Sequence, residues 1–317
     1  MISISFHGAV GTVTGSKYIL QVNDKKIMID CGMFQGRKEL RQRNWNEVAF
    51  DPKEIDSIFL THAHIDHIGY LPVMIKKGFT GKIYATEPTI DLAKILLLDA
   101  AHLQEEDAEY RNRKKITSHE KALPLFTTED AEGVFDQFHP IVFNKWKRLG
   151  KKFRIKPHIA GHILGAATLE IYLNDGEKEH SIFFSGDVGR YAVPLILDPE
   201  KPPVTDYFVC ESTYGGEVHQ PQDIFFEFAQ LIDKIVADKS ILLIPAFAVG
   251  RTQQIIYTLH VLQKQGRIPE IPINVDSPMA VKVTDVYKKY NAYNQINEDV
   301  VKDAKHGFYG KNVKLHR

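Results

Sequence analysis

The densest group of chemically active side chains in the sequence is the stretch THAHIDHIG at residues 61–69. It places ligand-type residues at the spacing H-x-H-x-D-H, namely His62, His64, Asp66 and His67. The preceding SIFL favours a strand, and alternation along an extended backbone directs His62 and His64 to the same side. The turn that follows can bring Asp66 and His67 to a neighbouring point. Two imidazoles at one point, and a carboxylate with an imidazole at another, suit two cations such as Zn²⁺.

Four side chains cannot fill two metal sites. Three stretches elsewhere in the sequence offer further candidate ligands. AGHILGAA (160–167) places His162 in a glycine-flanked turn, FFSGDVG (183–189) places Asp187 at the end of a hydrophobic strand, and IMIDCG (27–32) ends a strand on Asp30. A single acid at a strand end is usually only a turn former. In a chain that also carries the histidine motif, the three residues support one another as parts of a metal site.

The elements that position these residues are short β-rich runs punctuated by turn formers. The pattern predicts strands at 2–6, 17–22, 25–30, 57–62, 82–86, 152–158, 168–173, 181–186 and 207–212. It predicts a helix at 89–115, where apolar residues recur every three and four positions, and a shorter helix at 128–138 that Thr127 or Thr128 would cap.

After about residue 217 helices and strands alternate, which is typical of a parallel α/β unit. The expected order is helix 223–238, strand 240–247, helix 250–266, strand 271–277 and helix 278–290. We therefore expect one domain over residues 1–217 and a second over 218–317.

The composition of the chain does not favour general binding to a polyanion or insertion into a membrane. The 317 residues include 40 Lys and Arg and 40 Asp and Glu, so no global field attracts nucleic acid or a membrane. No apolar run approaches the ~20 residues of a membrane helix, and the start does not resemble a signal peptide. Two cysteines, Cys31 and Cys210, are too few for a disulfide framework. We expect a soluble, cytoplasmic protein without a membrane partner.

One stretch is locally basic, with seven Lys or Arg and no acid between Lys145 and Lys156. Lysines at a solvated strand edge discourage edge-to-edge pairing. Contact with a polyanion is the second interpretation, and the sequence leaves both open.

Taken together, the motifs resemble a known family. GAVGTVTGSKYIL, MIDCGMFQG, LTHAHIDHIGYLP, FSGDVGR, VCESTYGG, IPAFAVGRTQQIIYTL and VDSPMA are similar to the beta-CASP branch of the metallo-beta-lactamase superfamily. The similarity covers nearly the whole chain and is greatest to the bacterial and archaeal ribonucleases related to the pre-mRNA 3′-end processing endonuclease. The resemblance implies an α/β fold: a metallo-beta-lactamase αββα sandwich with an inserted beta-CASP α/β domain.

The same resemblance implies roles for individual residues. His62, His64 and His162 would hold one zinc, Asp66 and His67 a second, and Asp187 would bridge both. Asp30 would orient ligands, and Glu211 in the E-S-T-Y-G context is the acidic residue that precedes the insert; with Asp66 these two are the predicted catalytic residues. Arg251 and Ser277 are candidate phosphate or RNA contacts. The alternatives left open are that Arg251 only holds two loops together and that Ser277 only caps a helix.

The implied reaction is zinc-dependent hydrolysis of an RNA phosphodiester by metal-activated water. Two Zn²⁺ ions, offset by Asp66, Asp187 and a bridging hydroxide, keep a net positive charge that favours an anionic oxygen. Hydrolysis of thioesters or lactones is one alternative, and a catalytically incomplete fragment that binds RNA or a partner is another. RNA is the expected partner, and a homo-oligomer is left open.

Family members continue beyond this length and carry two further histidines. His219, His260, His306 and His316 lack the glycine-rich context of those residues. We therefore expect the second zinc site to be one ligand short in this chain, and the chain to be part of a longer protein in which both domains are complete.

Overall fold

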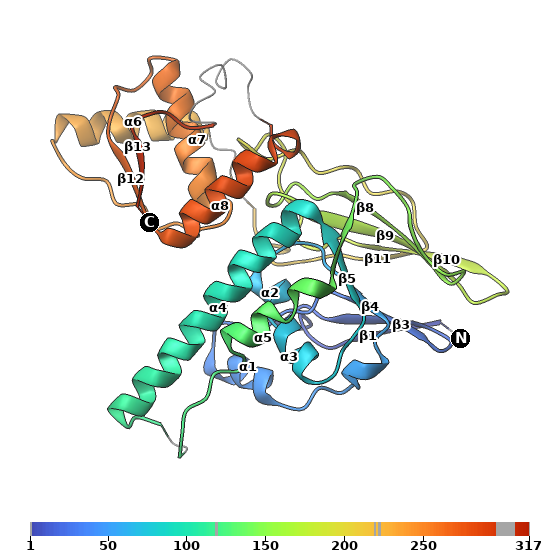
Figure 1. The fold of residues 1–317 in the computed structure, drawn as a ribbon. Coiled ribbons are helices and arrows are strands. Elements are labelled where there is room, and N and C mark those ends of the chain that lie inside the picture. Colours follow the sequence, from blue (N-terminus) through green and yellow to red (C-terminus); the bar gives the residue numbers. More distant parts are fainter. Residues whose placement is uncertain (1, 118–119, 219, 221–222, 296–307, 317) are drawn as a thin grey trace. The chain divides into compact units, whose positions relative to one another are not determined.

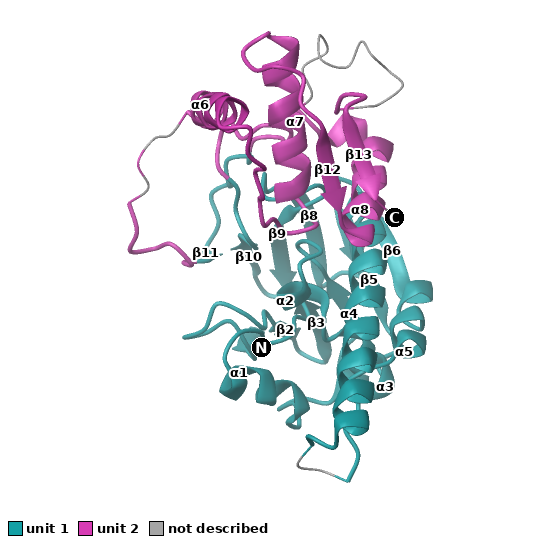
Figure 2. Ribbon diagram, turned by 90° about the vertical axis from the view of Figure 1, so that its left-hand side faces the viewer, with its two compact units in different colours: residues 1–189, 199–211 teal, residues 190–198, 212–317 magenta. Residues whose placement is uncertain are grey.

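The computed structural model describes residues 2–117, 120–218, 220, 223–295 and 308–316 (Figure 1). His219 and His306 lie outside these residues. The chain forms two compact units, residues 1–189 with 199–211 and residues 190–198 with 212–317 (Figure 2). Each unit is described by itself.

The first unit contains a six-stranded sheet of order β1-β2-β3-β4-β5-β6. Its strands are β1 (Ile2–Phe6), β2 (Tyr18–Val22), β3 (Lys25–Ile29), β4 (Ser57–Phe59), β5 (Lys82–Thr86) and β6 (Phe138–Ile141). The strands β1 to β3 pair antiparallel, and the strands β3 to β6 pair parallel. Parallel pairing brings the carboxyl ends of four strands to one edge of the sheet, which is where polar residues can gather.

Helices cover the outer face of this sheet (Figure 1). They are α1 (Lys38–Gln42), α2 (Ile65–Ile68), α3 (Leu71–Lys76), α4 (Glu87–Lys114) and α5 (Thr128–Glu132). All three residues of β4 are buried, as expected for a strand that is covered on both faces. Thr86 caps α4, because its hydroxyl accepts the N–H of Thr89.

A second sheet of order β11-β10-β9-β8-β7 packs against the other face of the first. Its strands are β7 (Lys147–Leu149), β8 (Phe153–Ile159), β9 (Ala167–Asn174), β10 (Glu179–Phe184) and β11 (Tyr207–Val209). Only β10 and β11 pair parallel within it. Alternate residues of both sheets form one apolar core, exemplified by Leu20, Ile29, Phe59, Leu169 and Phe184.

The second unit consists of helices around a two-stranded parallel sheet. Its elements are α6 (Ile224–Ala237), α7 (Arg251–Lys264), β12 (Ile273–Asp276), α8 (Pro278–Lys289) and β13 (Val313–His316), and β12 pairs with β13. Ile232 of α6 packs with Leu259 and Leu262 of α7 in a small core of its own. His260 lies buried within α7.

Two secondary-structure predictions are wrong. Residues 240–247 form no strand, and Ile241, Leu243 and Phe247 are 94%, 86% and 85% exposed. A strand requires a hydrogen-bonded neighbour, which these residues lack among the described residues, and Pro245 has no N–H to donate. The predicted helix 128–138 ends at Glu132, because Gly133 caps it and Phe138 begins β6, which pairs with β5.

The basic run covers β7, which is the edge strand of the second sheet, the turn that follows it and the first half of β8. Three of its side chains form ion pairs: Lys152 with Asp24, Arg154 with Glu179 and Lys156 with Glu170. These pairs favour the interpretation of the run as a solvated strand edge. The described residues contain no helix of the length and apolarity that crossing a membrane requires.

Candidate metal centre

The ligand-type residues meet because each follows the end of a strand at the same edge of the two sheets. Asp30 follows β3, His62 follows β4, His162 follows β8, Asp187 follows β10 and Glu211 follows β11. Two glycines let the connecting loops approach closely. A Cβ at Gly32 would lie 1.5 Å from the carbonyl oxygen of Asp66, and one at Gly189 would lie 1.6 Å from that of Gly161.

Four donor atoms converge at one point, offered by His62, His64, His162 and Asp187, and all lie within 4.8 Å of one another. Nδ1 of His64 is 3.0 Å from Nε2 of His62 and 3.1 Å from Nε2 of His162. Oδ2 of Asp187 is 3.6 Å and 3.5 Å from those two Nε2 atoms. Three nitrogens and one oxygen that lie this close together form a donor set that suits a divalent metal ion.

The protonation of these groups fits a cation. Burial, together with the neighbouring histidines, lowers the pKa of His62 well below its usual value and that of His64 to about 3. Burial also lowers the pKa of His162. Burial alone would raise the pKa of Asp187, but the hydrogen bond and charge of His67 hold it at about 2. Three neutral imidazoles facing one carboxylate have lone pairs directed inward, so the residues present fit a divalent metal.

A second group shares the same carboxylate. Oδ1 of Asp187 lies 3.2 Å from Nε2 of His67, whereas its Oδ2 faces His62 and His162. Oδ2 of Asp66 lies 3.9 Å from the same His67 nitrogen, and burial raises the pKa of Asp66. The two oxygens of Asp187 are therefore divided between two sets of ligand atoms.

Asp30 and Thr61 hold the histidines in orientation. Asp30 is 1% exposed and has a φ of 55°, and its Oδ2 lies 2.7 Å from Nδ1 of His67. The hydroxyl of Thr61 donates to the same carboxylate, and Nδ1 of His62 lies 3.0 Å from that hydroxyl oxygen. The Thr61 hydroxyl has one proton, which it donates to Asp30, so its oxygen accepts the N–H at Nδ1 of His62. Nε2 of His62 therefore carries the lone pair, and this lone pair faces the donor atoms of His64, His162 and Asp187.

Glu211 lies beside the loop that carries Asp187. Its Oε1 accepts the N–H of Val188 at 3.1 Å, and its own N–H donates to Oγ of Ser185 at 2.9 Å. Its charge also opposes the lowering of the pKa of His162. These contacts connect β11 to the loop between β10 and Gly189.

The two remaining candidates lie in the second unit. Arg251 is exposed and begins α7 after Gly250, which has a φ of 81°. Ser277 is the N-cap of α8, because its hydroxyl accepts the N–H of Ala280 at 3.2 Å. Thr61 was not among the sequence candidates, although it lies inside the histidine motif, where a polar residue at a buried strand end is the available signal.

Comparisons with known proteins identify two domains. Residues 19–184 match the model of the metallo-beta-lactamase superfamily domain, and residues 252–315 match that of the Beta-Casp domain. The expected α/β fold class is thereby confirmed.

Named relatives extend over nearly the whole chain. The chain is 36% identical to ribonuclease TTHA0252 of Thermus thermophilus over 96% of its length and 64% of the relative's. It is 32% identical to cleavage and polyadenylation specificity factor 73 of Drosophila melanogaster over 93% of its length and 41% of the relative's. It thus spans less than two thirds of either protein. A structure of a protein of unknown function from Enterococcus faecalis V583 shares the fold, with a TM-score of 0.53, 15% identity and coverage of 92% of this chain and 68% of that chain.

Proposed function

The chain belongs to the beta-CASP branch of the metallo-beta-lactamase superfamily, and on that premise we propose that it is a zinc-dependent hydrolase of RNA phosphodiester bonds. The observation that carries the proposal is the division of the Asp187 oxygens between two sets of ligand atoms. The names of two relatives, a ribonuclease and a cleavage factor, support RNA as the substrate.

His62, His64, His162 and Asp187 would hold one zinc, and Asp66, His67 and Asp187 would hold the second. Bound as a pair, the two metals would lower the pKa of a bound water and would favour negative charge on the attacked phosphate. Among the described residues the second set has three side chains and the first has four, so we expect the second metal to bind more weakly.

The chain's own residues prepare this centre. Asp30 orients His67 directly and His62 through Thr61. Asp66 lies with its carboxylate toward Nε2 of His67. Glu211 fixes the backbone next to Asp187, so we assign it a positioning role. Arg251, exposed at the N-terminus of α7, is our proposed phosphate contact, and Ser277 is a second and weaker candidate because its hydroxyl caps α8.

We also propose a division near residues 217 and 218 into a metal-binding domain and an inserted domain. A cytoplasmic location is supported by Cys31 and Cys210, which are both free thiols.

The test compares a short single-stranded RNA with a thioester as substrates of the zinc-loaded chain. RNA cleavage that is lost in chelator and in His64→Ala, but retained in His102→Ala, is the expected result. His102 is a suitable control because it is exposed on α4 and its Nε2 lies 3.3 Å from a carboxylate oxygen of Glu106 on the same helix. Cleavage of the thioester with intact RNA, or cleavage of neither, would refute the proposal.

A further inference from the structure

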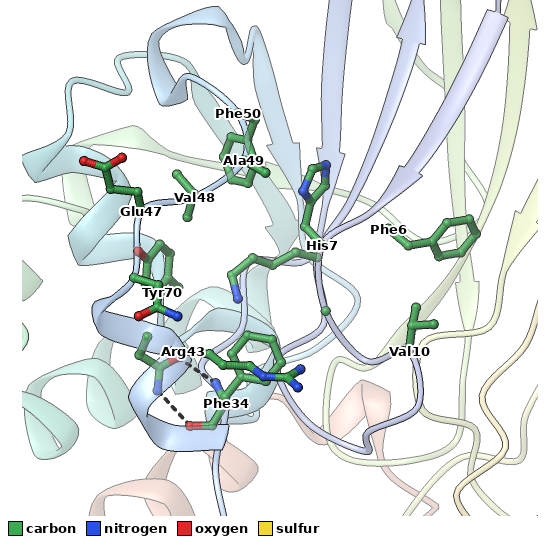
Figure 3. A pocket seen from close by; sticks show the side chains of 14 residues that line it. Phe6, His7, Val10, Phe34, Arg43, Glu47, Val48, Ala49, Phe50 and Tyr70 are labelled. Atoms are coloured by element: carbon green, nitrogen blue, oxygen red, sulfur yellow. Dashed lines mark hydrogen bonds between the residues drawn. The ribbon is translucent and has the colours of Figure 1, made fainter. Parts of the chain in front are cut away.

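A pocket of about 460 Å³ opens in the first unit, on a surface that the metal centre does not use (Figure 3). It is lined by the end of β1 and the loop that follows it, by Lys17, Phe34 and Tyr70, and by residues 43, 44 and 46–50. Its volume lies within the roughly 300–1,000 Å³ of small-molecule sites. Its walls combine aromatic rings with basic side chains, and none of its lining residues belongs to the two sets of metal ligands.

The most unusual residue of the pocket is Lys17, which is only 3% exposed. Its ammonium nitrogen lies 4.8 Å from the ring centroids of both Phe34 and Tyr70. Among the described residues it donates one hydrogen bond, to the carbonyl oxygen of Gly15, and this bond is 3.4 Å long. No carboxylate in the described part of the chain forms an ion pair with it. A buried ammonium with three donors and one long hydrogen bond is costly unless a further acceptor completes its environment.

A second cation faces the same aromatic ring. The guanidinium carbon of Arg43 lies 5.5 Å from the centroid of Phe34, and Arg43 itself is exposed. It forms no ion pair with the residues that the structure describes. Figure 3 shows Glu47 well apart from the Arg43 guanidinium, so that part of the pocket keeps its positive charge.

Contacts within the protein hold the backbone of Phe34 and the rings of His7 and Phe50. Asn44 accepts the N–H of Phe34 at 2.9 Å and donates to its carbonyl oxygen at 2.8 Å, as the dashed lines in Figure 3 show. On the opposite wall the rings of His7 and Phe50 meet edge to face with centroids 4.9 Å apart. A pocket with fixed walls loses little entropy on binding a ligand.

We propose that this pocket binds a nucleoside monophosphate, with the phosphate between Lys17 and Arg43 and the base against the aromatic walls. A phosphate group carries up to two negative charges and so matches two cations that form no ion pair with a described carboxylate. Guanidinium groups bind phosphate through two parallel hydrogen bonds, and an ammonium adds a compact charge. Aromatic side chains stack on any base. The proposal does not depend on the hydrolytic function.

The same phosphomonoester chemistry occurs on a free nucleotide and on the 5′-phosphorylated end of a nucleic acid. Competition between adenosine 5′-monophosphate and a 5′-phosphorylated DNA dinucleotide separates the two sources. Displacement by the dinucleotide assigns the pocket to a nucleic-acid end, and its failure to compete assigns the pocket to free nucleotide.

Isothermal titration calorimetry of the zinc-loaded full chain with adenosine 5′-monophosphate tests the proposal. We expect binding that weakens roughly tenfold in Arg43→Gln and in Lys17→Met, as for the loss of one charge-assisted hydrogen bond. Arg41→Gln is the matched control, since Arg41 is exposed two residues away and does not line the pocket. Arg43→Gln alters only a surface side chain, so it tests the site even where Lys17→Met fails to fold.

Three outcomes would overturn the proposal. The first is the absence of binding, and the second is equal affinity for adenosine, which has no phosphate. The third is binding that resists both pocket substitutions and disappears in His162→Ala, because the phosphate would then lie at the metal centre.

Discussion

The carboxylate of Asp30 lies 2.7 Å from Nδ1 of His67, and this contact fixes which nitrogen of the imidazole faces the candidate metal centre. Nε2 of His67 is thereby directed at Oδ1 of Asp187, 3.2 Å away. The same Asp30 carboxylate accepts the hydroxyl of Thr61, which in turn contacts Nδ1 of His62. One buried acid therefore orients one histidine from each set of ligand atoms.

Replacing Asp30 by Asn should weaken metal binding without removing a ligand. The amide keeps the shape of the side chain but loses the negative charge that His67 contacts. Loss of such a partner costs roughly 10–100-fold in metal affinity. Competition with a chromophoric zinc chelator measures the effect, and Asp136→Asn, at an exposed site, is the control. Equal affinity of Asp30→Asn and the unaltered chain would contradict the orienting role.

Thr61→Val should lower the free energy of unfolding. Thr61 is 1% exposed, and its hydroxyl lies 2.9 Å from Oδ2 of Asp30. Valine fills the same space but leaves a buried carboxylate with one donor fewer, which costs about 1–3 kcal/mol. Urea unfolding of the metal-free chain gives the value. Thr80→Val, at an exposed threonine, should leave the free energy of unfolding unchanged. An equally small effect of Thr61→Val would contradict the stabilising role of the hydrogen bond between Thr61 and Asp30.

Binding of the second metal should release a proton, whereas binding of the first should not. Burial opposes protonation of His67, but Asp30 and Asp187 raise its pKa well above the usual value, so its ring carries a proton at neutral pH. The pKa values of His62, His64 and His162 are lowered, so these rings are already neutral. Affinity for the second metal should consequently rise with pH by about one proton per ion. Calorimetry in buffers of different ionisation enthalpy counts the protons, and equal release in both steps would contradict the assignment.

Lys17 should make the unfolding free energy depend on pH. Burial lowers its pKa from 10.5 to about 8, so between these values the folded chain binds fewer protons than the unfolded chain. The free energy of unfolding should therefore rise with pH through this window, by about 3 kcal/mol at 1.4 kcal/mol per pKa unit. Urea unfolding at several pH values measures the slope, which should flatten in Lys17→Met. The same slope in both proteins would show that Lys17 is not the titrating group.

Much of the metal centre could be predicted from sequence because its ligands lie in short motifs at strand ends. The H-x-H-x-D-H spacing brings His62 and His64 together through local geometry alone, and strand ends that share one edge bring His162 and Asp187 to them. The spacing of the histidines and the order of the strands place the ligands at the same edge, so the sequence pattern predicts the site.

Features that depend on tertiary packing were not accessible in this way. Residues 240–247 have the composition of a strand but lack a described neighbour to pair with. Lys17 precedes a strand and resembles an ordinary surface lysine, and only the packing of Phe34 and Tyr70 around its ammonium distinguishes it. The division of the Asp187 oxygens likewise depends on side-chain placement across two sheets.

The central claim is that His62, His64, His162 and Asp187 form a zinc site. Anomalous diffraction at the zinc absorption edge, from crystals grown with zinc, tests it most directly. We expect an anomalous peak within about 2.0–2.2 Å of the three ring nitrogens and of Oδ2 of Asp187. A zinc-replete crystal without a peak among these four atoms would contradict it.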